Sequence, residues 1–419
     1  MDKSTGGKNP NILVIYPDQL RYDSMGCAGN AVVKTPHFDR LALEGARFTR
    51  AYASYPLCCP FRASLVTGKY AHATGMYANH FPIDTNQNFL APNLKEQGYD
   101  TAFFGKWHLY GGPLPGFVPP GPDRLGFDRF VGFNRGHHYM KALYWKDTDQ
   151  PYHCPRWEPD FQTDQLVDYI EERKDEESPF FAYMCYGPPH YPNDMPEHLK
   201  NLYSPEEVVL PPGVPDPKLQ IRTQKWKLEH DCAGNEAALD KSHSGAKKEG
   251  PFDPESEQEI REFIAQYYGM VTGIDQNVGR VLNCLDRTGL ADNTVVILLS
   301  DHGDMFGQNG SFCGVKRSYH DASMHVPVIV RYPGVAEAGN VIDEMIDVGV
   351  DTMPTLLEIC GRDIPAEVQG TSYLPLLDGS SSFGRENIMY QIIGQDNCEG
   401  GGTYLPIPER GVRNEKWLY

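Results

Sequence analysis

Five short apolar segments predict the strands of this protein. Residues 11–16 (NILVIY) and 294–299 (TVVILL) are unbroken apolar runs, which is typical of strands buried on both faces. Residues 99–104, 180–186 and 326–330 are enriched in aromatic, β-branched and other apolar side chains. Because strands buried on both faces occur mainly in parallel sheets, these segments favour a sheet that is covered on each side.

Segments with helical periodicity lie between these strands. Residues 36–46 carry apolar side chains at helical spacing, and residues 255–285 form a much longer amphipathic pattern. The apolar stripe of the longer segment consists of Ile260, Phe263, Ile264, Tyr267, Val271, Ile274, Val278, Val281 and Leu285. This alternation of strands and helices predicts an α/β fold, with a large, mixed and mostly parallel sheet sandwiched by helices.

The length of 419 residues allows one large domain, or a large domain with a small one. We predict a main domain over residues 1–379 and a small α+β subdomain over residues 385–419, joined by the sequence SSSFG at 380–384. Residues 207–255 are polar and show no clear period. They are interpreted either as a surface excursion or as a substrate lid.

Composition narrows the possible partners and locations. The net charge of −18 disfavours binding to nucleic acid or to an anionic membrane. No apolar segment approaches the roughly 20 residues that span a bilayer, and residues 1–10 lack the apolar core of a secretory signal. A cytoplasmic location is therefore expected unless a leader has been removed. Ten cysteines without a CxxC pair predict reduced, mostly buried thiols and disfavour zinc.

Two of the predicted buried strands end in polar pairs. Asp18-Gln19 follows the first apolar run, and Asp301-His302 follows the run at 294–299. An isolated Asp after a strand often serves only a turn. However, parallel sheets bind ligands at the carboxyl ends of their strands, so the two pairs are expected to meet. Their oxygens and imidazole nitrogen suit Ca²⁺, Mg²⁺ or Mn²⁺.

The segment 56–70 (PLCCPFRASLVTGKY) contains a candidate nucleophile. Pro60 fits the first turn of a helix, which places Cys58 just ahead of the helix N-terminus. The helix dipole and free N–H groups favour anions there, and Arg62 lies one turn into the helix. A lone cysteine in this position is more often a buried structural thiol than a catalytic one.

The string Cys58-Cys59-Pro60-Phe61-Arg62, with Thr67-Gly68 after it, resembles the Cys-x-Pro-Ser-Arg…Thr-Gly signature of the type I sulfatases. These formylglycine-dependent enzymes belong to the alkaline-phosphatase-like superfamily. Only Cys58 has Pro at +2 and Arg at +4. The resemblance implies that a formylglycine-generating enzyme converts Cys58 to formylglycine. Phe61 departs from the family pattern, which usually has Ser.

Other segments match the same family in chain order. The segments NILVIYPDQ and SDHGD resemble its two metal segments, which implies Asp18, Gln19, Asp301 and His302 as ligands. Positions of family catalytic residues are matched by Lys106 and His108 in GYDTAFFGKWH, His190 in PFFAYMCYGPPHYP, and Lys316 ahead of Val326-Pro327. Candidate substrate-binding residues are Asn79, His138 in the pair His137-His138, and His325, which stands where the family usually has Arg.

The resemblance implies a catalytic main domain that hydrolyses a sulfate monoester on a small molecule or oligosaccharide, with a sulfated carbohydrate as the favoured substrate. One divalent cation would assist, with calcium favoured over magnesium or manganese. Arg62, Lys106 and Lys316 would stabilise charge on the sulfate oxygens. His190 or Lys316 would protonate the leaving oxygen, and His108 would accept a proton from the nucleophile.

The sequence is also compatible with two other functions. A phosphonate or phosphate ester hydrolase on the same fold is favoured by Gln19, His302 and Asn79, whereas Lys106 and His108 are the sulfatase-type pair. A non-catalytic binding protein is supported only by Phe61. The last residues, RGVRNEKWLY, resemble the start of the family's small C-terminal sheet, so a truncated subdomain is expected.

Overall fold

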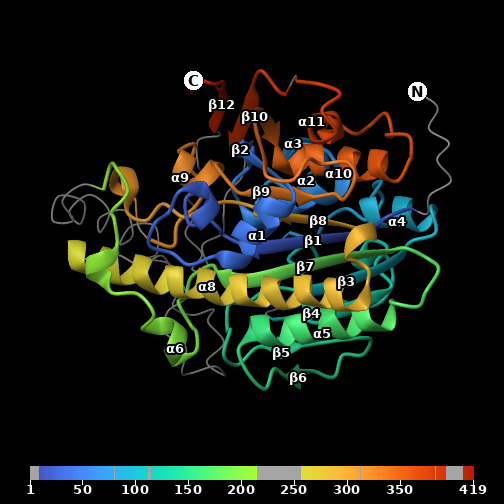
Figure 1. The fold of residues 1–419 in the computed structure, drawn as a ribbon, viewed down its shortest axis with the longest axis horizontal. Coiled ribbons are helices and arrows are strands. Elements are labelled where there is room, and N and C mark those ends of the chain that lie inside the picture. The colour runs from blue at the N-terminus through green and yellow to red at the C-terminus, as the bar shows by residue number, and fades with distance from the viewer. Residues whose placement is uncertain are drawn as a thin grey trace.

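The computed structural model describes residues 9–79, 81–111, 115–214, 256–311, 313–382, 384–392 and 409–419. An eight-stranded sheet forms the centre, with helices on both of its faces (Figure 1). Its strands lie in the order β10-β2-β9-β8-β1-β7-β3-β4. They are β1 (Asn11–Asp18), β2 (Ala46–Tyr52), β3 (Asp100–Lys106), β4 (Arg129–Phe133), β7 (Phe180–Pro189), β8 (Thr294–Leu299), β9 (Val328–Arg331) and β10 (Asn340–Asp347).

Strand direction sets the position of the functional side chains. β9 pairs antiparallel with its neighbours β2 and β8, whereas the other pairings in this sheet are parallel. The neighbouring strands β8, β1, β7 and β3 therefore all end at the same edge. Polar side chains that follow these four strands are brought together without any further constraint from the loops.

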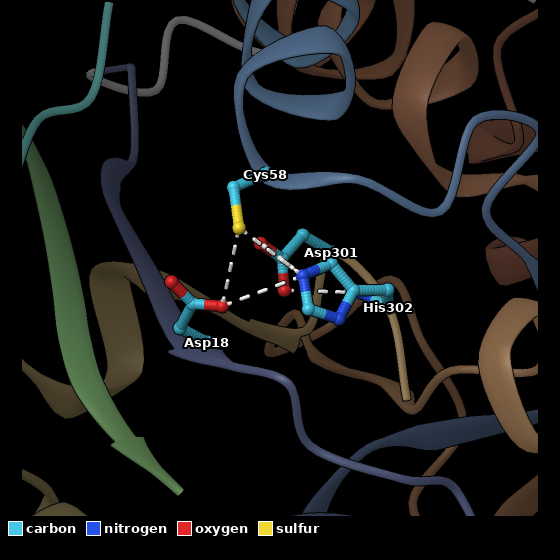
Figure 2. A group of neighbouring side chains, drawn as sticks. All are labelled: Asp18, Cys58, Asp301 and His302. Carbon is cyan, nitrogen blue, oxygen red and sulfur yellow. Dashed lines mark hydrogen bonds and ion pairs between the residues drawn. The ribbon is translucent and has the colours of Figure 1, made fainter. Parts of the chain in front are cut away.

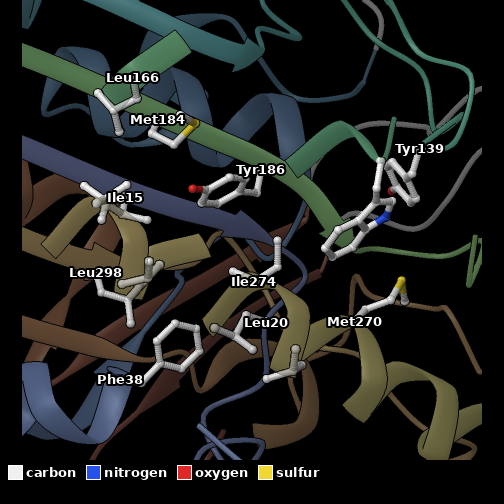
Figure 3. Close-up of a cluster of buried hydrophobic side chains, with 14 of the residues drawn as sticks. Ile15, Leu20, Phe38, Tyr139, Leu166, Met184, Tyr186, Met270, Ile274 and Leu298 are labelled. Atoms are coloured by element: carbon white, nitrogen blue, oxygen red, sulfur yellow. The ribbon is translucent and has the colours of Figure 1, made fainter. Parts of the chain in front are cut away.

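Alternate side chains of β1 face two separate hydrophobic layers. Leu13 and Ile15 pack with α1, α5 and α8, whereas Ile12 and Val14 pack with α2, α4 and α10. Figure 3 shows part of the first layer, where Ile15 lies near Leu298. The helices are α1 (Pro36–Glu44), α2 (Cys58–Thr67), α3 (Ala71–Thr74), α4 (Leu90–Lys95), α5 (Glu158–Glu172), α6 (Glu197–Lys200), α8 (Glu257–Thr288), α9 (Asp321–Met324), α10 (Val348–Ile359) and α11 (Leu374–Leu377).

The predicted fold class is confirmed, and so are most of the predicted elements. The segment 294–299 is β8 without a shift, and the long amphipathic pattern is α8. The Ser256 side chain caps α8 by accepting a hydrogen bond from the Glu259 N–H, and Gly289 ends it at a φ of 73°. The prediction at 326–330 corresponds to β9. The pattern did not predict β2, β4 or β10.

The C-terminal segment forms a separate two-stranded antiparallel sheet of β11 (Ile388–Ile392) and β12 (Glu409–Arg413). Ile388 and Tyr390 pack on Tyr52 and Leu57, close to the start of α2. Another two-stranded sheet joins β5 (Leu143–Tyr144) to β6 (Tyr152–His153). Most of the predicted excursion at 207–255 lies outside the described residues. In the part of the chain that is described, no helix combines the length and apolar character needed to span a membrane.

Candidate active site at the carboxyl edge of the sheet

Four buried side chains from distant parts of the chain converge at the carboxyl edge of the sheet (Figure 2). Asp18 ends β1, Asp301 and His302 follow β8, and Cys58 is the first residue of α2. One ligand atom from each of the four lies within 4.8 Å of the others. The sequence-based expectation that the two acidic strand ends meet beside residue 58 therefore agrees with the structure.

The two carboxylate oxygens of Asp18 have different surroundings. Oδ2 accepts hydrogen bonds from Lys106 Nζ at 2.6 Å and from an Arg62 guanidinium nitrogen at 3.1 Å. Oδ1 faces Cys58 Sγ at 3.8 Å and His302 Nε2 at 3.5 Å. Burial alone would raise the pKa of Asp18, but the charges of Lys106 and Arg62 hold it well below its usual value. Asp18 is therefore an anion whose Oδ1 remains available to a ligand.

Asp301 is fixed by hydrogen bonds on both oxygens. Its Oδ1 accepts the backbone N–H groups of Gln19 and His302, each at 3.0 Å. Its Oδ2 accepts the Tyr16 hydroxyl at 3.1 Å. Burial, together with the negative charge of Asp18, raises the pKa of Asp301 to about 7. A divalent cation beside both carboxylates would reverse this repulsion and favour the ionised form.

His302 presents a lone pair to both carboxylates. Its Nδ1 lies 3.1 Å from the carbonyl oxygen of Gly303, which can only accept, so Nδ1 carries the hydrogen. Burial and the charge of Lys316 lower the pKa of His302, and the imidazole is neutral. Nε2 then faces Asp18 Oδ1 at 3.5 Å and Asp301 Oδ2 at 3.4 Å without a hydrogen between them. Three electron-pair donors arranged in this way fit a bound cation.

Gln19, which follows Asp18, carries a side-chain amide whose orientation is fixed by Asp304. The Gln19 Nε2 donates to Asp304 Oδ2 at 2.6 Å, and its Oε1 accepts from Lys316 Nζ at 3.2 Å. Asp304 Oδ1 accepts the backbone N–H groups of Phe306 and Gly314 at 2.9 and 3.0 Å. Because both oxygens of Asp304 are used as acceptors, the Gln19 amide cannot rotate without losing a hydrogen bond.

Cys58 is held at the start of α2 but is not an activated thiol. Asn79 caps the helix from another loop, because its Oδ1 accepts the Cys59 N–H at 3.1 Å. Burial, reinforced by the negative charge of Asp18, raises the pKa of the Cys58 thiol to about 12. Catalytic cysteines instead have a lowered pKa. The unmodified thiol is therefore a poor nucleophile at neutral pH.

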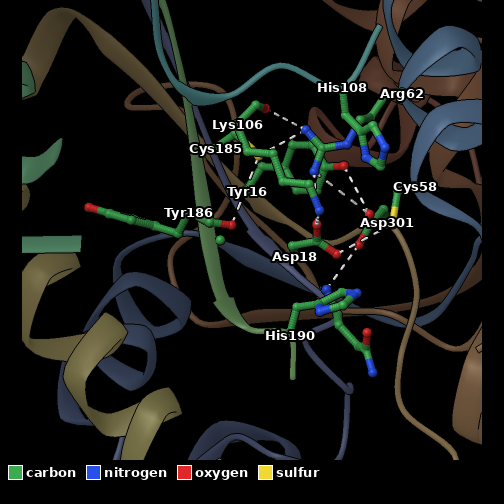
Figure 4. A network of polar contacts seen from close by, with 12 residues as sticks. Tyr16, Asp18, Cys58, Arg62, Lys106, His108, Cys185, Tyr186, His190 and Asp301 are labelled. Carbon is green, nitrogen blue, oxygen red and sulfur yellow. Dashed lines mark hydrogen bonds and ion pairs between the residues drawn. The ribbon is translucent and has the colours of Figure 1, made fainter. Parts of the chain in front are cut away.

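Arg62 is hydrogen-bonded to the backbone of Lys106, and both side chains bind the Asp18 carboxylate (Figure 4). An Arg62 N–H donates to the carbonyl oxygen of Lys106 at 2.6 Å, and the same nitrogen lies 3.1 Å from Cys185 Sγ. The guanidinium carbon lies 4.7 Å from the centre of the Tyr16 ring. Gly105 precedes Lys106 with a φ of 106°, and a Cβ there would overlap the carbonyl oxygen of Cys185. Only glycine fits this position.

His108, His190 and Lys316 lie around the same centre. The His108 backbone has a φ of 59° and is fixed by a 2.6 Å hydrogen bond from its N–H to the carbonyl oxygen of Asn134. His190 directly follows β7, and its Nε2 is hydrogen-bonded to Lys316 Nζ. Burial and the charge of Lys316 lower the pKa of His190.

The surroundings of two predicted substrate-binding residues, His325 and His138, are described by the structure. The His325 ring stacks on Tyr22 with centroids 4.0 Å apart, lies near Tyr52, and its Nε2 is 2.8 Å from the carbonyl oxygen of Thr49. Its ring therefore packs against β2, and its Nε2 contacts the backbone of that strand. His138 is half-buried in the loop after β4.

The sequence interpretation missed several residues of this network. Tyr16 and Asp304 lie inside the two segments that resemble the family's metal segments. Tyr16 is two residues before Asp18, and Asp304 is three residues after Asp301, so this proximity along the chain could have indicated them. Their partners could not be inferred from it, because Gln19 and Asp304 are 285 residues apart.

We predict that Asp304→Asn weakens cation binding by roughly 10- to 100-fold. In this variant the new amide oxygen would still accept the two backbone N–H groups, so the new amide nitrogen would oppose Gln19 Nε2. The Gln19 amide must then rotate and turn its oxygen away from the site. Calorimetric titration with Ca²⁺ measures the effect.

The double variant Gln19→Glu/Asp304→Asn is the matched control, because a carboxylate at position 19 can accept from the amide at 304. It should recover much of the lost affinity. Unchanged affinity in Asp304→Asn, with an unchanged thermal midpoint, would contradict the role of Asp304.

Comparisons with known proteins agree with this geometry. Residues 10–361 match the sequence profile of the sulfatase family. An ulvan-active sulfatase of Formosa agariphila is 31% identical over 98% of this chain and 72% of its own length. An N-acetylglucosamine-6-O-sulfatase of Bacteroides thetaiotaomicron is 28% identical over 88% of this chain and 71% of its length. The crystal structure of the putative sulfatase yidJ from Bacteroides fragilis superposes with a TM-score of 0.78, at 27% identity, over 100% of this chain and 87% of that one. The chain therefore belongs to the sulfatase family of sulfuric ester hydrolases, within the alkaline-phosphatase-like superfamily.

Proposed function

We propose that this chain hydrolyses a sulfate monoester of a sulfated carbohydrate, with Cys58 in its formylglycine form and one divalent cation. One oxygen of Asp18 binds two cationic side chains while the other faces Cys58, and this division supports the proposal most directly. Two similar proteins, an ulvan-active sulfatase and an N-acetylglucosamine-6-O-sulfatase, are named for carbohydrate substrates, which supports a carbohydrate substrate here.

The proposed cation ligands are Asp18, Gln19, Asp301 and His302. Calcium is the proposed ion, because carboxylate and amide oxygens are its ordinary ligands and it tolerates irregular geometry. Magnesium and manganese are the alternatives. When bound, the cation would polarise one sulfate oxygen and reduce the repulsion between the ester and its nucleophile.

Of the three basic side chains predicted to stabilise the sulfate, Lys106 and Lys316 are proposed to neutralise its remaining charge, whereas Arg62 is proposed to hold Asp18 in place. Lys106 uses one N–H for Asp18 and can point another at a sulfate oxygen. Arg62 is committed to Asp18, the Lys106 carbonyl oxygen and Cys185, so we propose that it fixes the anion site rather than the substrate. Lys316 lies between Gln19 and His190 and contacts both side chains.

The pair of Lys316 and His190 is proposed to protonate the leaving oxygen. The Lys316 ammonium donates to His190 Nε2, so one proton is shared between these two groups. His108, whose carbonyl oxygen accepts from Cys59 Sγ at 2.9 Å, is anchored beside the nucleophile segment. We propose that His108 accepts a proton from the group at position 58.

Conversion of Cys58 is part of the proposal. Burial and the negative charge of Asp18 raise the pKa of the thiol to about 12, so the unmodified side chain is largely protonated at neutral pH and is a weak nucleophile. Formylglycine would supply a hydrated aldehyde with two hydroxyl groups, one to attack and one to release the sulfate. Asn79, which caps the helix start, and His138 in the loop after β4 are proposed to border the substrate.

A phosphonate ester hydrolase is the second candidate, favoured by Gln19, His302 and Asn79. Charge does not separate the two reactions, because sulfate and phosphonate monoesters both carry a single negative charge. It does disfavour a phosphate monoester, which is largely dianionic at neutral pH. The amide and imidazole ligands leave the cation with little excess charge, which suits a monoanion.

We predict that converted protein cleaves p-nitrophenyl sulfate with a kcat/KM at least about tenfold above that for p-nitrophenyl phenylphosphonate, because Lys106 and His108 are the sulfatase-type pair. Sulfated mono- and oligosaccharides should then be screened for release of inorganic sulfate. A preference for the phosphonate in the same preparation would favour the second candidate.

We predict that activity follows the fraction of Cys58 converted, measured by peptide mass spectrometry across preparations. Cys58→Ala should lose at least about ten-thousandfold in kcat, because the nucleophile is absent. Cys59→Ser, which keeps a hydrogen-bond donor for His108, is the neighbouring control and should retain activity. Full activity in wholly unconverted protein would overturn the assignment of the nucleophile.

A further inference from the structure

His137, in the loop after β4, contacts the site although none of the metal or nucleophile segments contains it. Its ring lies parallel to that of His190, with centroids 3.8 Å apart and planes 7° apart. Its Nε2 is 3.4 Å from Lys106 Nζ, and its Nδ1 is 2.9 Å from the Tyr139 hydroxyl. One side chain therefore touches two of the predicted catalytic residues, Lys106 and His190.

The hydrogen-bond directions at His137 follow from its partners. An ammonium group can only donate, so His137 Nε2 accepts from Lys106 and the hydrogen of the neutral ring lies on Nδ1. Nδ1 then donates to the Tyr139 oxygen. The Tyr139 hydroxyl donates in turn to the carbonyl oxygen of His190 at 2.8 Å, and the carbonyl oxygen of Gly187 lies at 3.2 Å. The chain of donors and acceptors is consistent from Lys106 to the backbone of His190.

This network accounts for the orientation of Lys106. Among the described residues, Asp18 and His137 are the side chains that accept hydrogen bonds from its ammonium group. Two of its three hydrogens are thereby fixed, which leaves the third in a defined direction for a sulfate oxygen. Without His137, the ammonium group could rotate about its last bond and would be anchored by Asp18 alone.

The same residue constrains His190. The face of the His137 ring limits rotation of the His190 ring, and the Tyr139 hydroxyl anchors the His190 backbone. His190 Nε2 is then held against Lys316. A displacement of the His190 ring would separate its Nε2 from the Lys316 ammonium group, with which it shares a proton.

We propose that His137 is a positioning residue for sulfate ester hydrolysis, which sets Lys106 through its Nε2 and His190 through its ring face. This inference rests on the proposed function of His190 and Lys316 in protonating the leaving oxygen. His137 would then have two separable effects. Loss of the acceptor disturbs sulfate binding, whereas loss of the flat ring disturbs protonation of the leaving group.

Two variants test the effects separately. His137→Phe keeps a flat ring but has no acceptor, so inhibition by inorganic sulfate should weaken about tenfold and the losses on p-nitrophenyl sulfate and phenyl sulfate should be equal. His137→Gln keeps an acceptor but has no ring. Its kcat should fall more on phenyl sulfate than on p-nitrophenyl sulfate, by about tenfold, because the more basic phenolate depends more on protonation.

His153→Ala, at an exposed position in β6, is the control and should match the unaltered protein. Thermal midpoints show that each variant folds. Equal losses on both substrates for His137→Gln, together with unchanged sulfate inhibition for His137→Phe, would overturn the inference. That outcome is distinct from failure of the proposed function, in which the unaltered, converted protein itself would cleave no sulfate ester.

Discussion

The site depends on the divided environment of one carboxylate. Asp18 has no exposed surface, and an ionised carboxylate there would be strongly disfavoured without nearby positive charge. Lys106 and Arg62 supply that charge at Oδ2, so Oδ1 can face Cys58 and His302 as an anion. If either cationic side chain were absent, burial would favour the protonated acid, and the site would lose a negative ligand atom.

The surrounding structure follows from the need to hold these charges in a dry interior. Arg62 projects from the second turn of α2, while Lys106 ends β3, and their mutual hydrogen bond ties the helix to the sheet. Asp301 and His302 follow β8, which pairs directly with β1. The pairing of β1 with β8 therefore positions the proposed ligands, and the start of α2 places Cys58 beside them. Long-range electrostatic interactions are stronger in such a buried site than in water.

The part of this arrangement that sequence could predict has a physical basis. Strands β1 and β8 are buried on both faces, so they form unbroken apolar runs whose ends can be located. Strand β2 mixes Arg47, Thr49 and Arg50 with apolar residues, and β10 lies at the edge of the sheet, so neither forms an apolar run. The candidate ligands lie at the end of a strand or within three residues after it, so the ends of the apolar runs indicated them. The partners that orient them, such as Asp304 and His137, are defined by contacts across the fold and have no local pattern.

The central claim is that Asp18 Oδ1, Asp301 Oδ2 and His302 Nε2 jointly bind a cation beside residue 58. Anomalous diffraction from crystals grown with Mn²⁺ tests it directly. We predict a single strong peak within about 2.0–2.6 Å of these atoms, next to the side chain at position 58. A peak elsewhere, or an ordered site in which Asp18 and Asp301 coordinate no ion at saturating Mn²⁺ or Ca²⁺, would contradict it.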